Sequence, residues 1–261
     1  MNIDTGPADE RAVASLARMI MAADRILVFT GAGISTKSGI PDYRGPQGVW
    51  NTRRPVFYDE FMTSEASRRE YWRQKLEDRD AFGRAEPNAV HHAIVRLEQA
   101  GKLELLVTQN IDGLHRSAGS DPARLVEVHG TAARIECQSC GERSEPAPHF
   151  ARFAATDVPP TCSCGGYLKP ATISFGQSLR QGDLLRAFTA AERADLVLAL
   201  GSTLAVTPAA DIPLAAAQAG AGYVIVNQGP TEHDRLPLVS LRIEGDVCAI
   251  VPAAIEAALG S

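Results

Sequence analysis

Short apolar segments alternate with helical patterns along most of this 261-residue chain. Several of the segments are apolar almost throughout, which is typical of strands buried on both faces of a sheet. They cover residues 25–30, 103–108, 124–130, 196–201, 223–227 and 239–243. The helical patterns cover residues 10–22, 87–100, 182–193, 208–219 and 246–259. This alternation predicts an α/β fold with a Rossmann-like, doubly wound parallel sheet.

Two stretches interrupt the alternation. Residues 41–86 contain a loop followed by polar helical sequence, and we expect them to form an insertion that covers a cofactor site. Residues 131–169 contain four cysteines, several prolines and paired glycines, which is typical of a small module held together by a metal. The sequence therefore predicts a dinucleotide-binding domain from residues 1–130 and 170–261, and a metal-binding module over residues 131–169.

The composition disfavours several classes of function. Hydrophobic residues make up 45% of the chain and charged residues 22%, with a net charge of -5. A negatively charged chain is not attracted to a phosphate backbone, so we expect no direct nucleic-acid partner. No apolar run approaches the length of a membrane span, and the N-terminus lacks the basic start of a secretory signal. We therefore expect no membrane association and a cytoplasmic location.

Four of the five cysteines form two close pairs, Cys137 with Cys140 and Cys162 with Cys164. Two pairs on tight turns deliver four thiolates to a tetrahedral Zn²⁺ without a large core, whereas disulfides need an oxidising compartment. We predict one structural zinc ion per chain, with four reduced thiols or a redox pair as the alternative. Cys248 lies in an apolar stretch, and we expect it to be a buried thiol.

A glycine-rich turn follows the first predicted strand. Gly31, Ala32 and Gly33 stand where we expect that strand to pass into a helix, an arrangement that brings backbone N–H groups and a helix N-terminus to a pyrophosphate. Thr36 occupies the place of the third glycine of the dinucleotide fingerprint, and no acidic residue about 20 positions on offers itself to a ribose. A standard dehydrogenase is therefore disfavoured. Taken alone, the turn is equally explained by a need for positive φ.

Polar or glycine residues also follow other predicted strands. Parallel sheets bind ligands at the carboxyl ends of their strands, so we expect these residues to meet the glycine turn at one crevice. They are Asn110, Asp112, His129, Gly201 and Asn227. The segment IPDYRG, residues 40–45, adds an aromatic ring, a carboxylate and a guanidinium on a chain stiffened by Pro41.

The motifs occur in the order GAGIS, SGIPDYR, TQNID, HG, the two cysteine pairs, FG, GST and VNQG. This order, over about residues 25–250, resembles that of the sirtuin family of NAD-dependent protein deacylases. The resemblance implies a lysine deacetylase that transfers an acyl group from an acyl-lysine protein or peptide to ADP-ribose and releases nicotinamide. An NAD hydrolase or ADP-ribosyltransferase using the same pocket, or a non-catalytic NAD-sensing scaffold, remains an alternative.

The resemblance also implies catalytic roles. His129 would be the general base that takes a proton from a ribose hydroxyl, and a neutral imidazole suits that work. Asn110 and Asp112 would orient the ribose and the nicotinamide carboxamide or its water. Each role has a plainer alternative, since Asp112 could cap the next helix and His129 could be a structural histidine.

In the same way, Asp42 would bond the carboxamide, and Tyr43 and Arg44 would belong to a mobile flap over NAD. A surface turn stiffened by Pro41 is the alternative. The other implied NAD-binding residues are Gly31, Ala32, Gly33, Gln109, Asn110, Ile111, Asp112, Gly201, Ser202, Asn227, Gln228 and Val247.

We expect the acyl-lysine between the metal module and the main domain, where an extended peptide can add as a strand. The implied substrate-binding residues are Ile173, Phe175, Gly176, Val206 and Tyr71. Gln177 stands where the family commonly has an acid. Members that remove acidic acyl groups carry an arginine three residues after the tyrosine, where this chain has Gln74, so neutral acyl groups are favoured.

Overall fold

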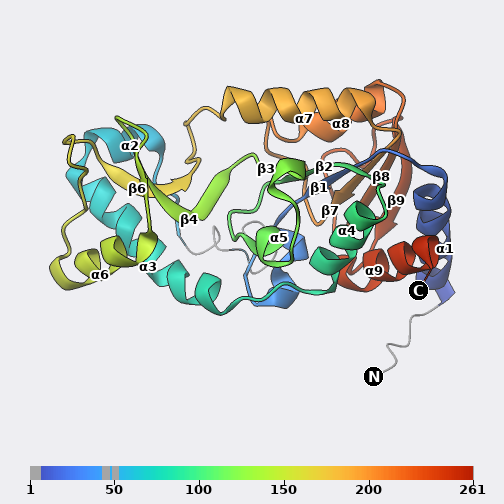
Figure 1. Ribbon diagram of the computed structural model, residues 1–261, viewed down its shortest axis with the longest axis horizontal. Helices are drawn as coiled ribbons and strands as arrows, with labels where there is room; N and C mark the ends of the chain where they lie inside the picture. The colour runs from blue at the N-terminus through green and yellow to red at the C-terminus, as the bar shows by residue number, and fades with distance from the viewer. Residues whose placement is uncertain (1–6, 43–47, 49–52, 261) are drawn as a thin grey trace.

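Six parallel strands form the central sheet, in the order β3-β2-β1-β7-β8-β9 (Figure 1). The computed structural model describes residues 7–42, 48 and 53–260. The strands are β1 (Ile26–Thr30), β2 (Leu103–Thr108), β3 (Leu125–Glu127), β7 (Leu196–Leu200), β8 (Gly222–Asn227) and β9 (Val239–Glu244). Every residue of β1 and β7 is buried, as their apolar sequence predicts. The predicted strands pair in one sheet, and the Rossmann-like fold class is confirmed.

The carboxyl ends of the central strands are level with one another. Thr30 at the end of β1 pairs with Thr108 of β2 on one side and with Leu200 of β7 on the other. Leu200 in turn pairs with Val226 near the end of β8. The loops that follow these four strands therefore leave the sheet side by side.

Helices cover both faces of the sheet (Figure 1). One face packs against α1 (Pro7–Ala22), α4 (Ala89–Gln99) and α9 (Val247–Leu259), and the other against α7 (Gln181–Arg193) and α8 (Asp211–Gln218). Two separate hydrophobic clusters result, because successive residues of a strand point to opposite faces. Val28 packs in one cluster and Phe29 in the other. All five helices lie within a few residues of the predicted ranges.

The cysteine-containing stretch is more regular than its sequence indicates. It forms an antiparallel sheet in the order β5-β4-β6, with β4 (Gly130–Cys137), β5 (Arg143–Ser144) and β6 (Leu168–Thr172), and a helix, α6 (Pro146–Thr156). Sequence periodicity is weak here because β4 buries its residues irregularly, with a register shift between Gly130 and Ile135, and the helix buries mainly Phe150 and Phe153. The sheet extends beyond residues 131–169 at both ends.

The polar helices of the insertion are α2 (Tyr58–Thr63) and α3 (Glu65–Arg84). They pack against the cysteine-containing sheet in a third hydrophobic cluster that includes Phe61, Trp72, Phe153 and Leu168. The Trp72 indole donates to the Leu168 carbonyl at 3.0 Å. Helices α2 and α3 therefore form a second lobe together with the metal module (Figure 1). Residues of α3 also line the cavity described next.

Candidate active site and metal centre

A cavity of about 1450 Å³ lies at the carboxyl ends of the parallel strands and extends to the second lobe. Single small-molecule pockets are commonly about 300–1,000 Å³, so this volume suits a dinucleotide together with part of a second ligand. Most of the site residues expected from the sequence line it. They are Gly31, Ala32, Gly33, Asp42, Tyr71, Gln109, Asn110, Ile111, His129, Ile173, Phe175, Gly176, Gly201, Ser202, Val206, Asn227, Gln228 and Val247. Asp112 does not line it, and Tyr43 and Arg44 lie outside the described residues.

The glycines after β1 allow two loops to interlock. A Cβ on Gly31 would lie 2.7 Å from the Gly201 carbonyl oxygen, and one on Gly33 would lie 2.8 Å from the Gly201 Cα. Gly201 has a φ of +61°, and a Cβ on it would lie 2.6 Å from the Ile34 backbone nitrogen. The cradle at this end of the cavity is therefore built from backbone, with no room for side chains.

The backbone of this turn differs from the sequence expectation. The N–H groups of Gly31 and Gly33 donate to the carbonyls of Leu200 and Gly201, at 3.0 and 2.9 Å, so they hold the two loops together. Two 3₁₀ turns, Ala32–Ile34 and Thr36–Ser38, follow β1 in place of the expected helix. The expected α-helix does not form at this turn, because the Gly31 and Gly33 N–H groups are bonded to the chain at and just after the end of β7 and the second 3₁₀ turn ends at Gly39, where φ is +86°.

A polar network fixes Asn110 at the floor of the cavity. Its Nδ2 donates to the Gly31 carbonyl and to Ser35 Oγ, both at 3.1 Å, and Ser35 Oγ donates to Asp112 Oδ2 at 2.8 Å. Asp112 Oδ1 also accepts from the Leu114 N–H at 2.9 Å, so Asp112 caps the next turn as well as serving the network. Burial raises the pKa of Asp112, and these two hydrogen bonds oppose that rise.

The tautomer of His129 follows from its hydrogen bond. Its Nδ1 lies 3.0 Å from the Gln109 carbonyl oxygen, which can only accept, so Nδ1 carries the hydrogen. In the neutral ring, Nε2 then holds the lone pair and can act as a base. The His129 carbonyl accepts from the Ile173 N–H at 2.7 Å, which joins this residue to the other wall of the cavity.

Ser202 and Asn227 shape the loops after β7 and β8. Ser202 lines the cavity, and its Oγ accepts from Gln109 Nε2 at 2.7 Å and from the Leu204 N–H at 3.1 Å, so the hydroxyl still has its own hydrogen to donate. Asn227 Nδ2 donates to the carbonyls of Gln228 and Gly229, both at 3.1 Å. Asn227 therefore holds a turn, the plainer role that its position allows.

Two buried histidines support the glycine turn from behind. His91 and His115 lie with ring centroids 4.9 Å apart, and His115 Nε2 is 3.1 Å from the hydroxyl of Thr30. Asn88, beside His91, donates to the Ile34 carbonyl at 2.7 Å. The sequence did not predict a role for either histidine. It also did not predict the role of Ser35, although a hydroxyl close after the glycine turn could have indicated a polar contact there.

The opposite end of the cavity lies on the second lobe. The Tyr71 hydroxyl is 3.2 Å from Thr172 Oγ1, and burial raises the pKa of Tyr71 to about 12. Residues 172–177, which we call the 172–177 edge, form this wall. Gln74 and Lys75 also line the cavity, and Lys75 Nζ is 5.5 Å from the Tyr71 ring centroid. Arg73 instead turns outward to Asp157, with Nη2 and Oδ2 2.6 Å apart.

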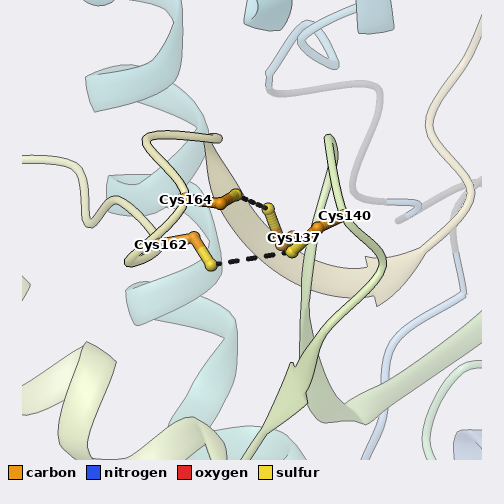
Figure 2. A group of neighbouring side chains, drawn as sticks. All are labelled: Cys137, Cys140, Cys162 and Cys164. Atoms are coloured by element: carbon orange, nitrogen blue, oxygen red, sulfur yellow. Dashed lines mark hydrogen bonds between the residues drawn. The ribbon is translucent and has the colours of Figure 1, made fainter.

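The four paired cysteines converge on one point (Figure 2). Their sulfur atoms all lie within 4.8 Å of one another, with 3.6 Å between Cys137 and Cys164 and 3.8 Å between Cys140 and Cys162. Zinc bonded to four thiolates at about 2.3 Å places the sulfurs about 3.8 Å apart, whereas a disulfide needs about 2.05 Å. The four cysteines are therefore positioned to bind a zinc ion that has no open coordination position.

Local structure explains why the sulfurs meet. Gly166 leaves room for the first pair, because a Cβ there would lie 2.6 Å from Cys137 Sγ. Hydrogen bonds from the backbone of Cys140, chiefly, and of Ser139 lower the pKa of Cys137 to about 6, which favours the thiolate that a metal requires. Cys248 lies elsewhere and is half-buried, less than expected, and burial raises its pKa to about 11.

Within the described residues, no helix has the length and apolar character needed to cross a bilayer.

Comparison with known proteins extends the likeness over nearly the whole chain. A family model described as Sir2 family matches residues 31–208. An NAD-dependent protein deacetylase of Rhodopseudomonas palustris is 40% identical over 237 residues, covering 90% of this chain and 94% of the relative. NAD-dependent protein deacylase 2 of Archaeoglobus fulgidus is 36% identical over 248 residues, covering 95% and 96%. A solved complex of Sir2 with p53 peptide and NAD+ superposes with a TM-score of 0.82 at 33% identity, covering 93% of this chain and 96% of the other.

Proposed function

The chain belongs to the Sir2 family, and from that membership we propose that it is an NAD-dependent protein lysine deacetylase that works in the cavity between its two lobes. Bound NAD would supply nicotinamide as a leaving group and a ribose that accepts the acyl group. The observation that carries the proposal is His129, whose tautomer is fixed by the Gln109 carbonyl and whose ring lines a cavity large enough for two ligands. We assign residues 1–130 and 170–261 to the NAD-binding domain, whose insertion at about 41–86 contributes helices α2 and α3 to the second lobe, and residues 131–169 to the metal module.

The chain's own groups divide the work. His129 Nε2 would take the proton of a ribose hydroxyl as that oxygen attacks the acyl carbon. Asn110 would hold the ribose side, because Ser35 and Asp112 fix its amide in one orientation. Asp42, which lines the cavity, would receive the carboxamide. Cys137, Cys140, Cys162 and Cys164 would hold a structural zinc ion that takes no part in proton transfer.

The acyl-lysine would enter along the 172–177 edge, beside Val206 and Tyr71. We favour neutral acyl groups, because the cations at this wall are already paired. Lys75 Nζ lies 3.8 Å from Asp78, and Arg53 also pairs with that carboxylate. We propose an acyl-lysine protein or peptide as the partner, with no direct nucleic-acid or membrane contact. The need for four reduced thiols supports a cytoplasmic location.

One incubation tests the proposal. The purified protein is mixed with NAD and an acetyl-lysine peptide, and both are followed by mass spectrometry. Loss of the acetyl group together with release of nicotinamide is expected. Nicotinamide release from an unchanged peptide would instead indicate NAD hydrolysis, transfer of ADP-ribose to protein would indicate an ADP-ribosyltransferase, and no change in either substrate would indicate a binding scaffold.

A further inference from the structure

A fully buried lysine lies behind the wall formed by the 172–177 edge. Lys169 in β6 has 0% of its surface exposed and does not itself line the cavity. Its ammonium donates to the Thr172 carbonyl and, at 3.3 Å, to Gln177 Oε1. Neither acceptor is charged. A buried cation without a bonded carboxylate is costly, and burial, with a smaller contribution from Lys75, lowers the pKa of Lys169 to about 7.

Both acceptors of Lys169 lie on the 172–177 edge, one at each end. Gln177 Oε1 also accepts from the Ser174 N–H at 3.1 Å, and the Gln177 N–H donates to the Ser174 carbonyl at 2.9 Å. The Gln177 side chain therefore closes the turn through residues 174–177, where Gly176 has a φ of +79°. Lys169 fixes the side chain that closes this turn.

The same glutamine ties the edge to the metal loop. Because its Oε1 faces the two donors, its Nε2 points the other way and donates to Gln138 Oε1 at 3.4 Å. Gln138 lies between the metal-binding Cys137 and Cys140. A second anchor comes from α2, where the Tyr58 N–H donates to the Phe175 carbonyl at 2.9 Å. The edge is thus also held by bonds to Gln138 and Tyr58, which do not line the cavity.

We infer that Lys169 is a positioning residue, which acts through Thr172 and Gln177 to hold the 172–177 edge in the shape that binds the acyl-lysine peptide. The identity of the ligand rests on the proposed function, whereas the positioning of the edge does not. Lys169 touches no substrate in this scheme. Its loss should weaken peptide binding and leave NAD binding and the chemical step unchanged.

Substitutions at both ends of the contact test this inference. Lys169→Met keeps an unbranched side chain but removes the donors, and Gln177→Leu removes the acceptor. Each should raise KM for an acetyl-lysine peptide about tenfold, with kcat and KM for NAD within about twofold of wild type. The double variant should raise KM by less than the product of the two single effects, because both substitutions remove the bond from Lys169 to Gln177. Gln177→Glu keeps an acceptor oxygen for Lys169 and for the Ser174 N–H but loses the donor to Gln138, so it should keep the Ser174 and Gln177 amides protected in the exchange experiment described below.

Lys102→Met is the matched control. Lys102 is half-buried and, like Lys169, donates to backbone oxygen, in its case the carbonyls of Met21 and Ala23, but it does not line the cavity. This variant should lose stability without a change in peptide KM. If Lys169→Met does not fold, the comparison of Gln177→Leu with Gln177→Glu still decides the outcome.

A measurement without any ligand separates this inference from the proposed function. In amide hydrogen exchange of the free protein, Ser174 and Gln177 should lose protection in Lys169→Met and Gln177→Leu, but not in Lys102→Met. Unchanged exchange at both amides in a folded Lys169→Met protein would overturn the inference. Wild-type protein that fails to deacetylate would count against the proposed function alone, since the exchange result stands without turnover.

Discussion

The bond from His129 Nδ1 to the Gln109 carbonyl decides what this ring can do, because it leaves Nε2 as the basic nitrogen. We expect His129→Ala to lower kcat at least about 100-fold, the usual scale for a lost general base. The Kd for NAD, measured by calorimetry, should stay within about threefold, since the loops that form the NAD end remain. His92→Ala is the control, because His92 is exposed on α4. Undiminished nicotinamide release and deacetylation by His129→Ala would reject the base assignment.

The buried pair His91 and His115 predicts acid sensitivity. Burial lowers the pKa of His115 to about 3 and that of His91 to about 4, whereas unfolded histidine titrates near about 6.5. The unfolded chain therefore takes up protons first, so this stability is fully present above about pH 6.5 and is lost as the pH falls toward 4. Each histidine adds a slope of at most about 1.4 kcal/mol per pH unit.

Thermal melts from pH 7 to pH 4 measure this slope. The melting temperature of wild type should fall more steeply than that of His115→Asn, whatever their difference at pH 7. His149→Asn is the control, because His149 is far less deeply buried. If the melting temperatures of wild type and His115→Asn fall in parallel as the pH is lowered, the histidine pair is not the source of the acid sensitivity.

Among the elements, the loops after β1 and β7 depend on each other because glycine backbones meet between them. A Cβ on Gly33 would lie 2.9 Å from the Gly201 carbonyl oxygen, and backbone there cannot move aside cheaply. We expect Gly33→Ala to lower the free energy of unfolding by about 1–3 kcal/mol and to weaken NAD binding. Gly182→Ala, in α7 with nothing within 4 Å, should instead be neutral or stabilising. Denaturant titration measures the free energy of unfolding, and calorimetry measures NAD binding. Equal values for Gly33→Ala and Gly182→Ala would contradict the close packing of Gly33 against Gly201.

Sequence periodicity predicted the alternating strands and helices. It missed local structure that depends on contacts with residues distant in the sequence. The ends of β1, β2, β7 and β8 were expected to meet because parallel strands share one edge, and they do. The two 3₁₀ turns after Gly31 were not foreseen, because Leu200 and Gly201 supply the acceptors that shape them. Lys75 was not predicted as a site residue, yet it lines the cavity together with Tyr71, since residues four apart share a helix face.

At the scale of the whole molecule, the cavity is shared between a lobe with a large sheet core and a lobe with a small one. The small cluster includes Trp72, Ile135 and Leu168, and Cys137 itself packs within it. Such a small core gains much of its folding free energy from a bound metal, because the site does not exist in the unfolded chain. The two lobes should therefore respond differently to loss of zinc.

We expect Cys137→Ser to release zinc and to lower the free energy of unfolding by more than about 2 kcal/mol, as measured by elemental analysis and denaturant titration. Hydrogen exchange should rise first over β4 and β6, and peptide affinity should fall more than NAD affinity, because the 172–177 edge continues from β6 whereas the glycine loops belong to the main sheet. Cys248→Ser removes a thiol outside the cluster and should keep its zinc. A Cys137→Ser protein that retains one zinc per chain, or that loses zinc yet melts like wild type, would show that the metal does not hold this lobe together.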